Sequence, residues 1–345
     1  MVIIVFFLKL KMIGQRILLA VPSLIGVIVV AFVLTRSLPG DPAVYFAGIT
    51  ADEESIAQIR EQLGLDKSIF HQFIVYCKNL TQGNLGVSLN TGQSVASELS
   101  ARFPASLELT LTGLALALMA AIPLGILAAV NPNTWIDHLC RIFVTAGAST
   151  PIFFSGLLLV FVFYYLLGWA PSPIGRLDFF YLSPPKVTGF YTIDAMINGD
   201  FETAAAAAKQ LILPAITLAI FALAPIARMT RSAMLTAMGS EYVKAATANG
   251  IGRRKIIFVY ALRNAMLPLL TIMGLVFSYL LGANVLVEKV FSWPGIGSFA
   301  VDALVASDFA AVQGFILVMA VMFVVLNLVI DILYTLVDPR VSIDG

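Results

Sequence analysis

Long apolar runs separated by polar segments dominate this chain. A bilayer span needs about 20 mostly apolar residues, and several stretches qualify. The six predicted spans are Ile13 to Leu34, Ala105 to Val130, Leu139 to Leu167, Leu211 to Ala227, Met266 to Val287 and Val312 to Leu336. Because lipid offers the backbone no hydrogen-bond partners, such spans must be helices. The pattern predicts an all-α polytopic membrane protein with six transmembrane helices.

The polar segments between the spans differ in length and character. The longest, 36–104, contains two stretches with helical spacing, Asp52 to Gly64 and Lys67 to Leu80, which predict a small helical subdomain on the outer membrane face. A second outer loop, Gly168 to Gln210, is interrupted by prolines and is expected to be irregular. On the other side, Arg228 to Ala265 is polar, basic and helical in character.

These segments divide the chain into five parts. They are an N-terminal extension (1–12), a first transmembrane helix (13–35), the extracytoplasmic helical subdomain (36–104), a transmembrane domain of five helices (105–337, including the segment 228–265) and a cytoplasmic tail (338–345). Val2 to Leu8 is too short to span, and Met12 is an alternative translation start. No cleavable signal peptide is expected, because the first apolar stretch runs too far.

Basic residues set the predicted orientation. Six spans place both termini on one side, and the cluster from Arg228 to Arg263 falls on that same side. Because basic residues near spans favour the cytoplasm, both termini are predicted to be cytoplasmic.

Composition supports a membrane protein and disfavours several other classes. Hydrophobic residues make up 59% of the chain and charged residues 12%, whereas soluble domains carry about 25% charged residues. The basic residues form no broad face, so nucleic acid is not an expected partner. By the predicted topology, Cys77 and Cys140 lie on opposite sides of the membrane, as do His71 and His138. Neither a disulfide between the cysteines nor a metal site is therefore expected.

Motifs for catalysis are also missing. A phosphate-binding loop needs G-x-x-x-x-G-K-[ST], and the chain contains no Gly-Lys pair. Gly147 to Thr150 superficially resembles the serine motif of an intramembrane protease, but neither histidine lies at membrane depth to act as the base. The chain is therefore predicted not to be an enzyme and to bind no cofactor of its own.

Two further classes of membrane protein remain open, an ion-coupled transporter and a scaffold or receptor. An ion-coupled transporter usually carries paired ionisable groups at the bilayer midplane, but Asp331 lies near the end of the last span and no relay is evident. Asn284 and Asn327 are expected to bond a neighbouring helix rather than to line a cavity. A membrane scaffold or receptor would show no transport at all.

The cytoplasmic segment carries the most informative pattern. Glu241 to Gly250 predicts a short helix that glycine stops. Small alanines within it would let another surface approach closely. A short helix held between two spans can act as a lever, although an ordinary amphipathic surface helix would show the same spacing.

This segment resembles the EAA loop of binding-protein-dependent ABC importer permeases, in which a small-residue helix is followed by glycine and then Leu-Pro. The corresponding residues are Ala245, Ala246, Gly250, Leu267 and Pro268. The acidic position of the general motif holds Lys244, with Glu241 three residues earlier, and the distance from the glycine to Leu-Pro is longer than usual.

Both departures resemble the dipeptide, oligopeptide and nickel permease branch, and further blocks carry the same resemblance. They are Leu38 to Ala43, Leu63 to Asp66, Gly83 to Ser88, Phe103 to Leu109, Val290 to Gly297 and Asp338 to Arg340. They occur in order over nearly the whole chain.

The resemblance implies a type I ABC importer transmembrane fold in a bacterial or archaeal inner membrane. The short helix would dock as a coupling helix on a separate ATPase subunit, through Glu241, Tyr242, Ala245, Ala246, Gly250 and Arg254. The implied partners are a sister permease, usually a different chain, two ATPase subunits that use ATP and Mg, and an extracytoplasmic binding protein. Trp293, Pro294 and Gly295 are candidate contacts for the binding protein. The implied cargo is a di- or oligopeptide, a nickel chelate or another small solute.

Overall fold

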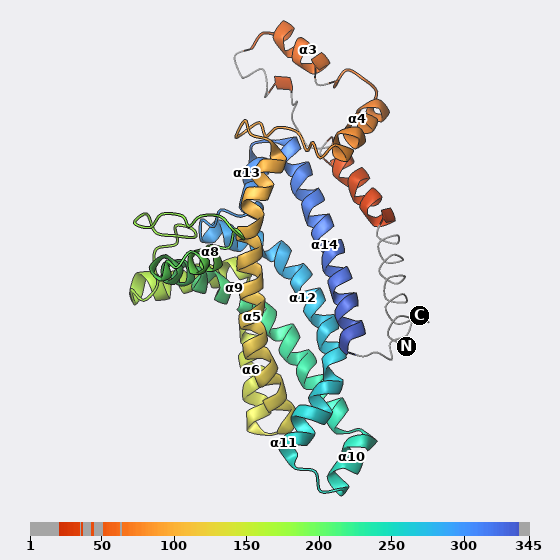
Figure 1. The fold of residues 1–345 in the computed structure, drawn as a ribbon, viewed down its shortest axis with the longest axis vertical. Coiled ribbons are helices and arrows are strands. Elements are labelled where there is room, and N and C mark those ends of the chain that lie inside the picture. The colour runs from red at the N-terminus through yellow and green to blue at the C-terminus, as the bar shows by residue number, and fades with distance from the viewer. Residues whose placement is uncertain (1–20, 35, 37–42, 45–50, 63, 338–345) are drawn as a thin grey trace. The chain divides into compact units, whose positions relative to one another are not determined.

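The computed structural model describes residues 21–34, 36, 43–44, 51–62 and 64–337 (Figure 1). The described part is built from helices, and its β pairing is limited to an isolated bridge between Val87 and Ser94. The predicted all-α class is confirmed.

Four described helices are long and apolar enough to cross a membrane, by length and composition. They are α5 (Val95–Val130), α9 (Phe201–Met238), the continuous helix Arg253–Val290, and α14 (Phe309–Val337). The helix Arg253–Val290 comprises α11 (Arg253–Lys255), the π-helical η2 (Ile256–Ala261) and α12 (Leu262–Val290). These helices correspond to the second, fourth, fifth and sixth predicted spans.

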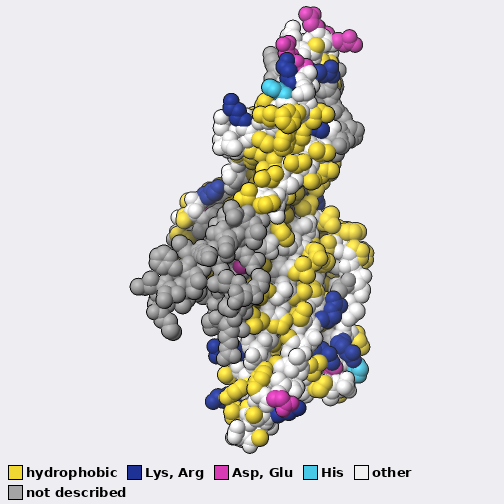
Figure 2. All heavy atoms as spheres, turned by 90° about the vertical axis from the view of Figure 1, so that its right-hand side faces the viewer, with side chains coloured by type: hydrophobic (Ala, Val, Ile, Leu, Met, Phe, Trp, Pro, Cys, Tyr) yellow, Lys and Arg dark blue, Asp and Glu magenta, His cyan; other side chains and the backbone are white. Residues whose placement is uncertain are grey.

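The first predicted span is only partly visible. Val21–Leu34 forms a shorter apolar helix, and the preceding residues of that span lie outside the described ranges. Figure 2 shows one face of the molecule, on which hydrophobic side chains cover long stretches of the helices. Exposed apolar side chains of this extent are suited to lipid rather than to water.

The third predicted span is two helices that meet at a sharp bend. α6 (Trp135–Ala148) is followed by α7 (Ile152–Leu159) and the π-helical η1 (Val160–Leu166), and the two halves form an angle of 95°. Pro151 lies at the break, where it lacks an amide donor and disfavours helical geometry at Thr150. The chain therefore turns where the hydropathy pattern alone indicates a continuous span.

The chain divides into two compact units. The first unit comprises residues 1–104 and 294–324. It contains α3 (Glu53–Gln62), α4 (Ile69–Thr81), α13 (Ile296–Val305) and the first parts of α5 and α14. α3 and α4 confirm the two helices predicted in the outer segment.

The core of the first unit joins α5, α13 and α14. Val95 and Leu99 pack with Phe299 and Ala311. Gly314 lets α14 approach closely, because a Cβ atom there would lie 2.5 Å from Val95 Cγ1. The unit is therefore held by side chains that are distant in sequence.

Asp308 fixes the loop before α5 within the same unit. Its carboxylate accepts a hydrogen bond from Ser88 Oγ at 2.5 Å and one from the amide of Asn90 at 3.3 Å. It also accepts from the amide of Ala311 at 3.2 Å, which satisfies a free amide in the first turn of α14.

The second unit comprises residues 105–293 and 325–345 and contains α6 to α12 with the remaining parts of α5 and α14. α9 packs against α12, α6, α7 and α8 (Tyr191–Ile197). Glycines bring α5 close to α9, since a Cβ atom at Gly125 would lie 2.5 Å from Thr230 Cβ and one at Gly113 would lie 2.7 Å from Leu218 Cβ. Small residues at such contacts are typical of membrane helices, where close van der Waals packing drives association.

The second outer loop is shorter and more ordered than the sequence indicated. It was expected to run irregularly to Gln210, but it contains α8, and α9 begins at Phe201. Asp200 caps α9 by accepting hydrogen bonds from the Thr203 amide at 3.0 Å and hydroxyl at 2.6 Å. This cap and the alanine run that follows it favour a helix, although hydropathy excluded these residues from the predicted span.

Candidate functional site

The predicted short helix is present as α10 (Glu241–Ala248). Gly250 ends it with φ of +73°, a conformation that glycine adopts without steric cost. The amide of Gly250 donates to the Thr247 carbonyl at 3.0 Å, and that of Ile251 donates to the Ala246 carbonyl at 3.1 Å. The turn therefore satisfies carbonyl groups that a helix end would otherwise leave free.

The residues predicted to contact a partner do not all lie on one face of α10. Glu241, Tyr242, Ala245, Gly250 and Arg254 are exposed. Ala246 is buried together with Val243, on the side that the helix turns toward its own chain. Glu241 also forms an exposed ion pair with Lys244 at 2.8 Å.

α10 is attached to the long helices on both sides. It contacts α9, which precedes it, and η2, which follows it. Arg253, at the start of α11, donates a hydrogen bond at 3.4 Å to the carbonyl of Val130, the last residue of α5. A displacement of α10 would therefore be transmitted directly to α9 and to the helix Arg253–Val290.

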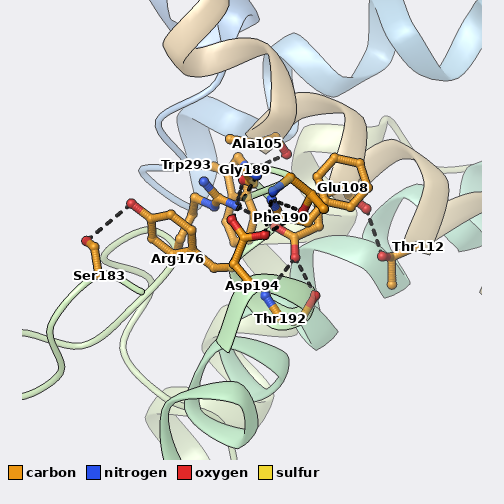
Figure 3. A network of polar contacts seen from close by, with 12 residues as sticks. Ala105, Glu108, Thr112, Arg176, Ser183, Gly189, Phe190, Thr192, Asp194 and Trp293 are labelled. Atoms are coloured by element: carbon orange, nitrogen blue, oxygen red, sulfur yellow. Dashed lines mark hydrogen bonds and ion pairs between the residues drawn. The ribbon is translucent and has the colours of Figure 1, made fainter. Parts of the chain in front are cut away.

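A second group of polar residues surrounds a buried ion pair between α5 and the second outer loop (Figure 3). Arg176 Nη2 donates to Glu108 Oε2 at 2.6 Å and to the carbonyl of Gly189 at 2.7 Å. The side chains of Arg176 and Glu108 are 6% and 3% exposed. The guanidinium carbon also lies 3.5 Å from the centroid of the Tyr191 ring, a distance that favours a cation–π interaction.

The other oxygen of Glu108 holds the start of α8. Oε1 accepts from the Thr192 amide at 3.1 Å and from its hydroxyl at 2.5 Å. The amide of Thr192 is in the first turn of α8, where no intrahelical acceptor is available. One carboxylate on α5 thus binds both the arginine of the loop and the helix that follows.

Asp194 folds the loop onto the same helix. It is buried and accepts hydrogen bonds from the amide of Val187 at 3.2 Å, from the amide and hydroxyl of Thr188, each at 2.7 Å, and from the amide of Gly189 at 2.8 Å. Burial alone would raise the pKa of this carboxyl, but the hydrogen bonds, led by that of Thr188, outweigh burial and lower it. The carboxylate is therefore the form that stabilises the loop.

The proposed binding-protein contacts differ in exposure. Trp293 is only 1% exposed, and its indole nitrogen donates to the carbonyl of Ala105 at 2.9 Å. Gly295 is also buried, whereas Pro294 is exposed. Trp293 therefore fixes the end of α12 to Ala105 of α5, and its side chain is buried in this structure.

A third polar group joins α12 to α5. Glu288 is fully buried and accepts hydrogen bonds from Ser106 Oγ at 2.5 Å and from Asn284 Nδ2 at 2.9 Å. Asn284 also donates to the carbonyl of Ser106 at 3.3 Å. The expectation that Asn284 bonds a neighbouring helix is therefore confirmed.

Hydropathy and motif patterns in the sequence did not indicate Glu108, Arg176, Asp194 or Glu288 as site residues. A signal was available for Glu108, because an ionisable residue inside a predicted span marks a functional or structural site by default. No comparable signal identified Arg176, which lies in an irregular loop far along the chain.

The chain is similar in sequence to membrane components of known transport systems. A family model described as the binding-protein-dependent transport system inner membrane component matches residues 121–343, and a model of the N-terminal part of such membrane components matches residues 9–110. The chain is 45% identical over 320 residues to the probable D,D-dipeptide transport system permease protein DdpB of Escherichia coli K12, covering 93% of this chain and 94% of that protein.

Two further relatives are similar over nearly their whole length. The di/tripeptide transport system permease protein DppB of Pseudomonas aeruginosa is 42% identical over 333 residues, covering 96% of this chain and 98% of that protein. The glutathione transport system permease protein GsiC of Escherichia coli O6:H1 is 36% identical over 327 residues, covering 95% and 97%.

Proposed function

We propose that this chain forms part of a translocation path for short peptides. It belongs to the family of binding-protein-dependent transport system inner membrane components. It is therefore a permease subunit of an ABC importer with the type I membrane fold. The names of the relatives support this substrate class, since D,D-dipeptides, di- and tripeptides and glutathione are all short peptides. A nickel chelate or another small solute is the alternative cargo.

The proposed complex contains this permease, a sister permease of different sequence, two ATPase subunits and an extracytoplasmic binding protein. The binding protein and the ATPases are expected from the family itself. ATP and Mg are used by the ATPase subunits, and the lack of a Gly-Lys pair in this chain supports that division of roles. Both termini lie in the cytoplasm, which places α10 on the ATPase side.

The observation that carries the mechanism is the attachment of α10 to a long helix on each side. The exposed residues Glu241, Tyr242 and Ala245, with Gly250 and Arg254 beyond the helix, form the docking surface for the ATPase. Ala246, which is buried, positions the helix on its own chain rather than contacting the partner. Closure of the ATPases pushes α10, and the displacement moves α9 and the helix Arg253–Val290, which opens the translocation path toward the outside.

Substitution of Gly250 tests the docking assignment. A Cβ atom at this exposed position would meet no atom within 4 Å, although the φ of +73° strains any side chain there. Gly250→Arg therefore projects a long cation from the docking surface and blocks the ATPase. Gly250→Asn is the matched control, because asparagine tolerates the left-handed conformation better than other residues. We expect Gly250→Arg to reach the membrane in normal amount but to lose ATP-driven uptake of a dipeptide, and Gly250→Asn to retain it. Normal uptake by Gly250→Arg would refute the docking assignment.

A further inference from the structure

A cavity of about 300 Å³ lies among α5, α6 and α9, within the second unit. Leu124 and Ala128 of α5, Val144 of α6 and Ala227 of α9 form its apolar wall. This volume is at the lower end of the range of small-molecule pockets. Neither the coupling helix α10 nor the ion pair of Glu108 contributes to it.

Three arginines line the same cavity: Arg141, Arg228 and Arg231. The buried carboxylate of Asp137 accepts two hydrogen bonds from Arg231, at 2.8 and 2.7 Å, and lies 3.6 Å from Arg141. The exposed Arg228 has no ion pair or hydrogen bond with any residue that the structure describes. The carboxylate of Asp137 therefore lies close to two of the three guanidinium groups, and the three arginines give the apolar cavity a surplus of positive charge.

The exposed face of α6 beside the cavity is apolar. Trp135, Leu139, Ile142 and Phe143 are each more than half exposed, and their spacing puts them on one stripe of the helix. In a membrane protein such a stripe contacts acyl chains, and tryptophan favours the level of the headgroups.

The depth of the cavity also fits a headgroup. Gly125, which lines it, precedes the end of α5 at Val130 by five residues, or about 7.5 Å along the helix at 1.5 Å per residue. The arginines therefore lie near one membrane surface rather than at the bilayer midplane. In the orientation proposed above, this is the cytoplasmic leaflet, which carries anionic lipids.

We propose that this cavity binds the phosphate of an anionic phospholipid. Arg141 and Arg228 bind the headgroup, Arg231 remains paired with Asp137, and the acyl chains lie along the apolar stripe of α6. Basic pockets between membrane helices suit such headgroups because guanidinium groups form charge-assisted hydrogen bonds with phosphate.

The site is tested by measuring how much phospholipid the protein retains when it is purified at full length with its partner subunits in mild detergent. Each arginine near the surface changes lipid affinity by about fivefold, so Arg141→Gln with Arg228→Gln should reduce affinity for phosphatidylglycerol by more than tenfold. Arg263→Gln is the control, because it removes an exposed arginine outside the cavity. Thr145→Phe fills the cavity from an exposed lining position and should reduce retention with every arginine in place.

Thermal stability measured with three added probes separates the sources of the anion. Phosphatidylglycerol should raise the melting temperature of the unaltered protein but not of the double variant, and phosphatidylethanolamine and inorganic phosphate should have little effect. An equal rise with inorganic phosphate would assign the site to a free anion and overturn the lipid proposal. Loss of a partner subunit from the double variant, or undiminished lipid retention, would also overturn it.

Discussion

Removal of the Glu108 charge should loosen the second outer loop by a predictable amount. Glu108→Gln keeps the size of the side chain and an oxygen that Thr192 can still bond, but it leaves the charge of Arg176 without its partner. Breaking a buried ion pair from one side costs about 3–5 kcal/mol. The carbonyl of Gly189 and the ring of Tyr191 still hold the guanidinium, so the lower end of that range applies.

Amide hydrogen exchange at Thr192 measures this change directly, because that amide donates to Glu108 Oε1 at 3.1 Å. Since 1.4 kcal/mol corresponds to a factor of ten, about 3 kcal/mol predicts exchange on the order of a hundredfold faster. Glu98→Gln is the matched control, since its pair with Arg102 at 2.8 Å is partly exposed and such pairs contribute at most about 1 kcal/mol.

Two measurements of Thr192 exchange decide whether the ion pair holds the loop. If the exchange of the Thr192 amide changes no more in Glu108→Gln than a surface pair would explain, the ion pair does not hold the loop. Combining Glu108→Gln with Arg176→Met should recover part of the lost protection, because the second substitution removes the unpaired buried charge.

Further predictions concern helix packing and acid sensitivity. Gly125→Ala places a methyl group 2.5 Å from Thr230 Cβ and should destabilise the protein by about 1–3 kcal/mol in thermal unfolding. Gly282→Ala, which meets no atom within 4 Å, should instead stabilise by about 0.5–1 kcal/mol, and equal effects of the two would refute the packing assignment. Because hydrogen bonds lower the pKa of Asp194 below its ordinary 3.8, its contribution to stability is complete above that pH and is lost as the pH falls through the lower value. Protection of the Gly189 amide, corrected for intrinsic exchange, should therefore be constant from pH 7 to 5 and fall only below about 3.8; a loss between pH 6 and 5 would contradict this.

Hydropathy predicted the long helices because a span must be apolar over its whole length, whatever it packs against. Hydropathy alone indicates neither the bend at Pro151 nor the early start of α9 at Phe201. A single proline hardly changes the hydropathy of an apolar run although it can bend the helix, and a capped alanine-rich turn is helical without being hydrophobic enough to count as a span.

The candidate site was predictable only where local sequence defines it. Gly250 ends α10 as expected, because the left-handed turn is a property of the residue itself. The burial of Ala246 and of Trp293 depends on which face packs inward, and the pairing of Glu108 with Arg176 joins segments 68 residues apart. Such contacts follow from tertiary packing and carry no periodic signal in the sequence.

Affinity purification of the tagged chain in mild detergent, followed by mass spectrometry of the proteins that accompany it, tests the central claim most directly. The proposed function predicts recovery of ATPase subunits, a sister permease of different sequence and a binding protein whose bound ligand is a short peptide. Recovery of this chain alone, under conditions that keep a known importer intact, would contradict the proposed assembly and the role of α10 in coupling.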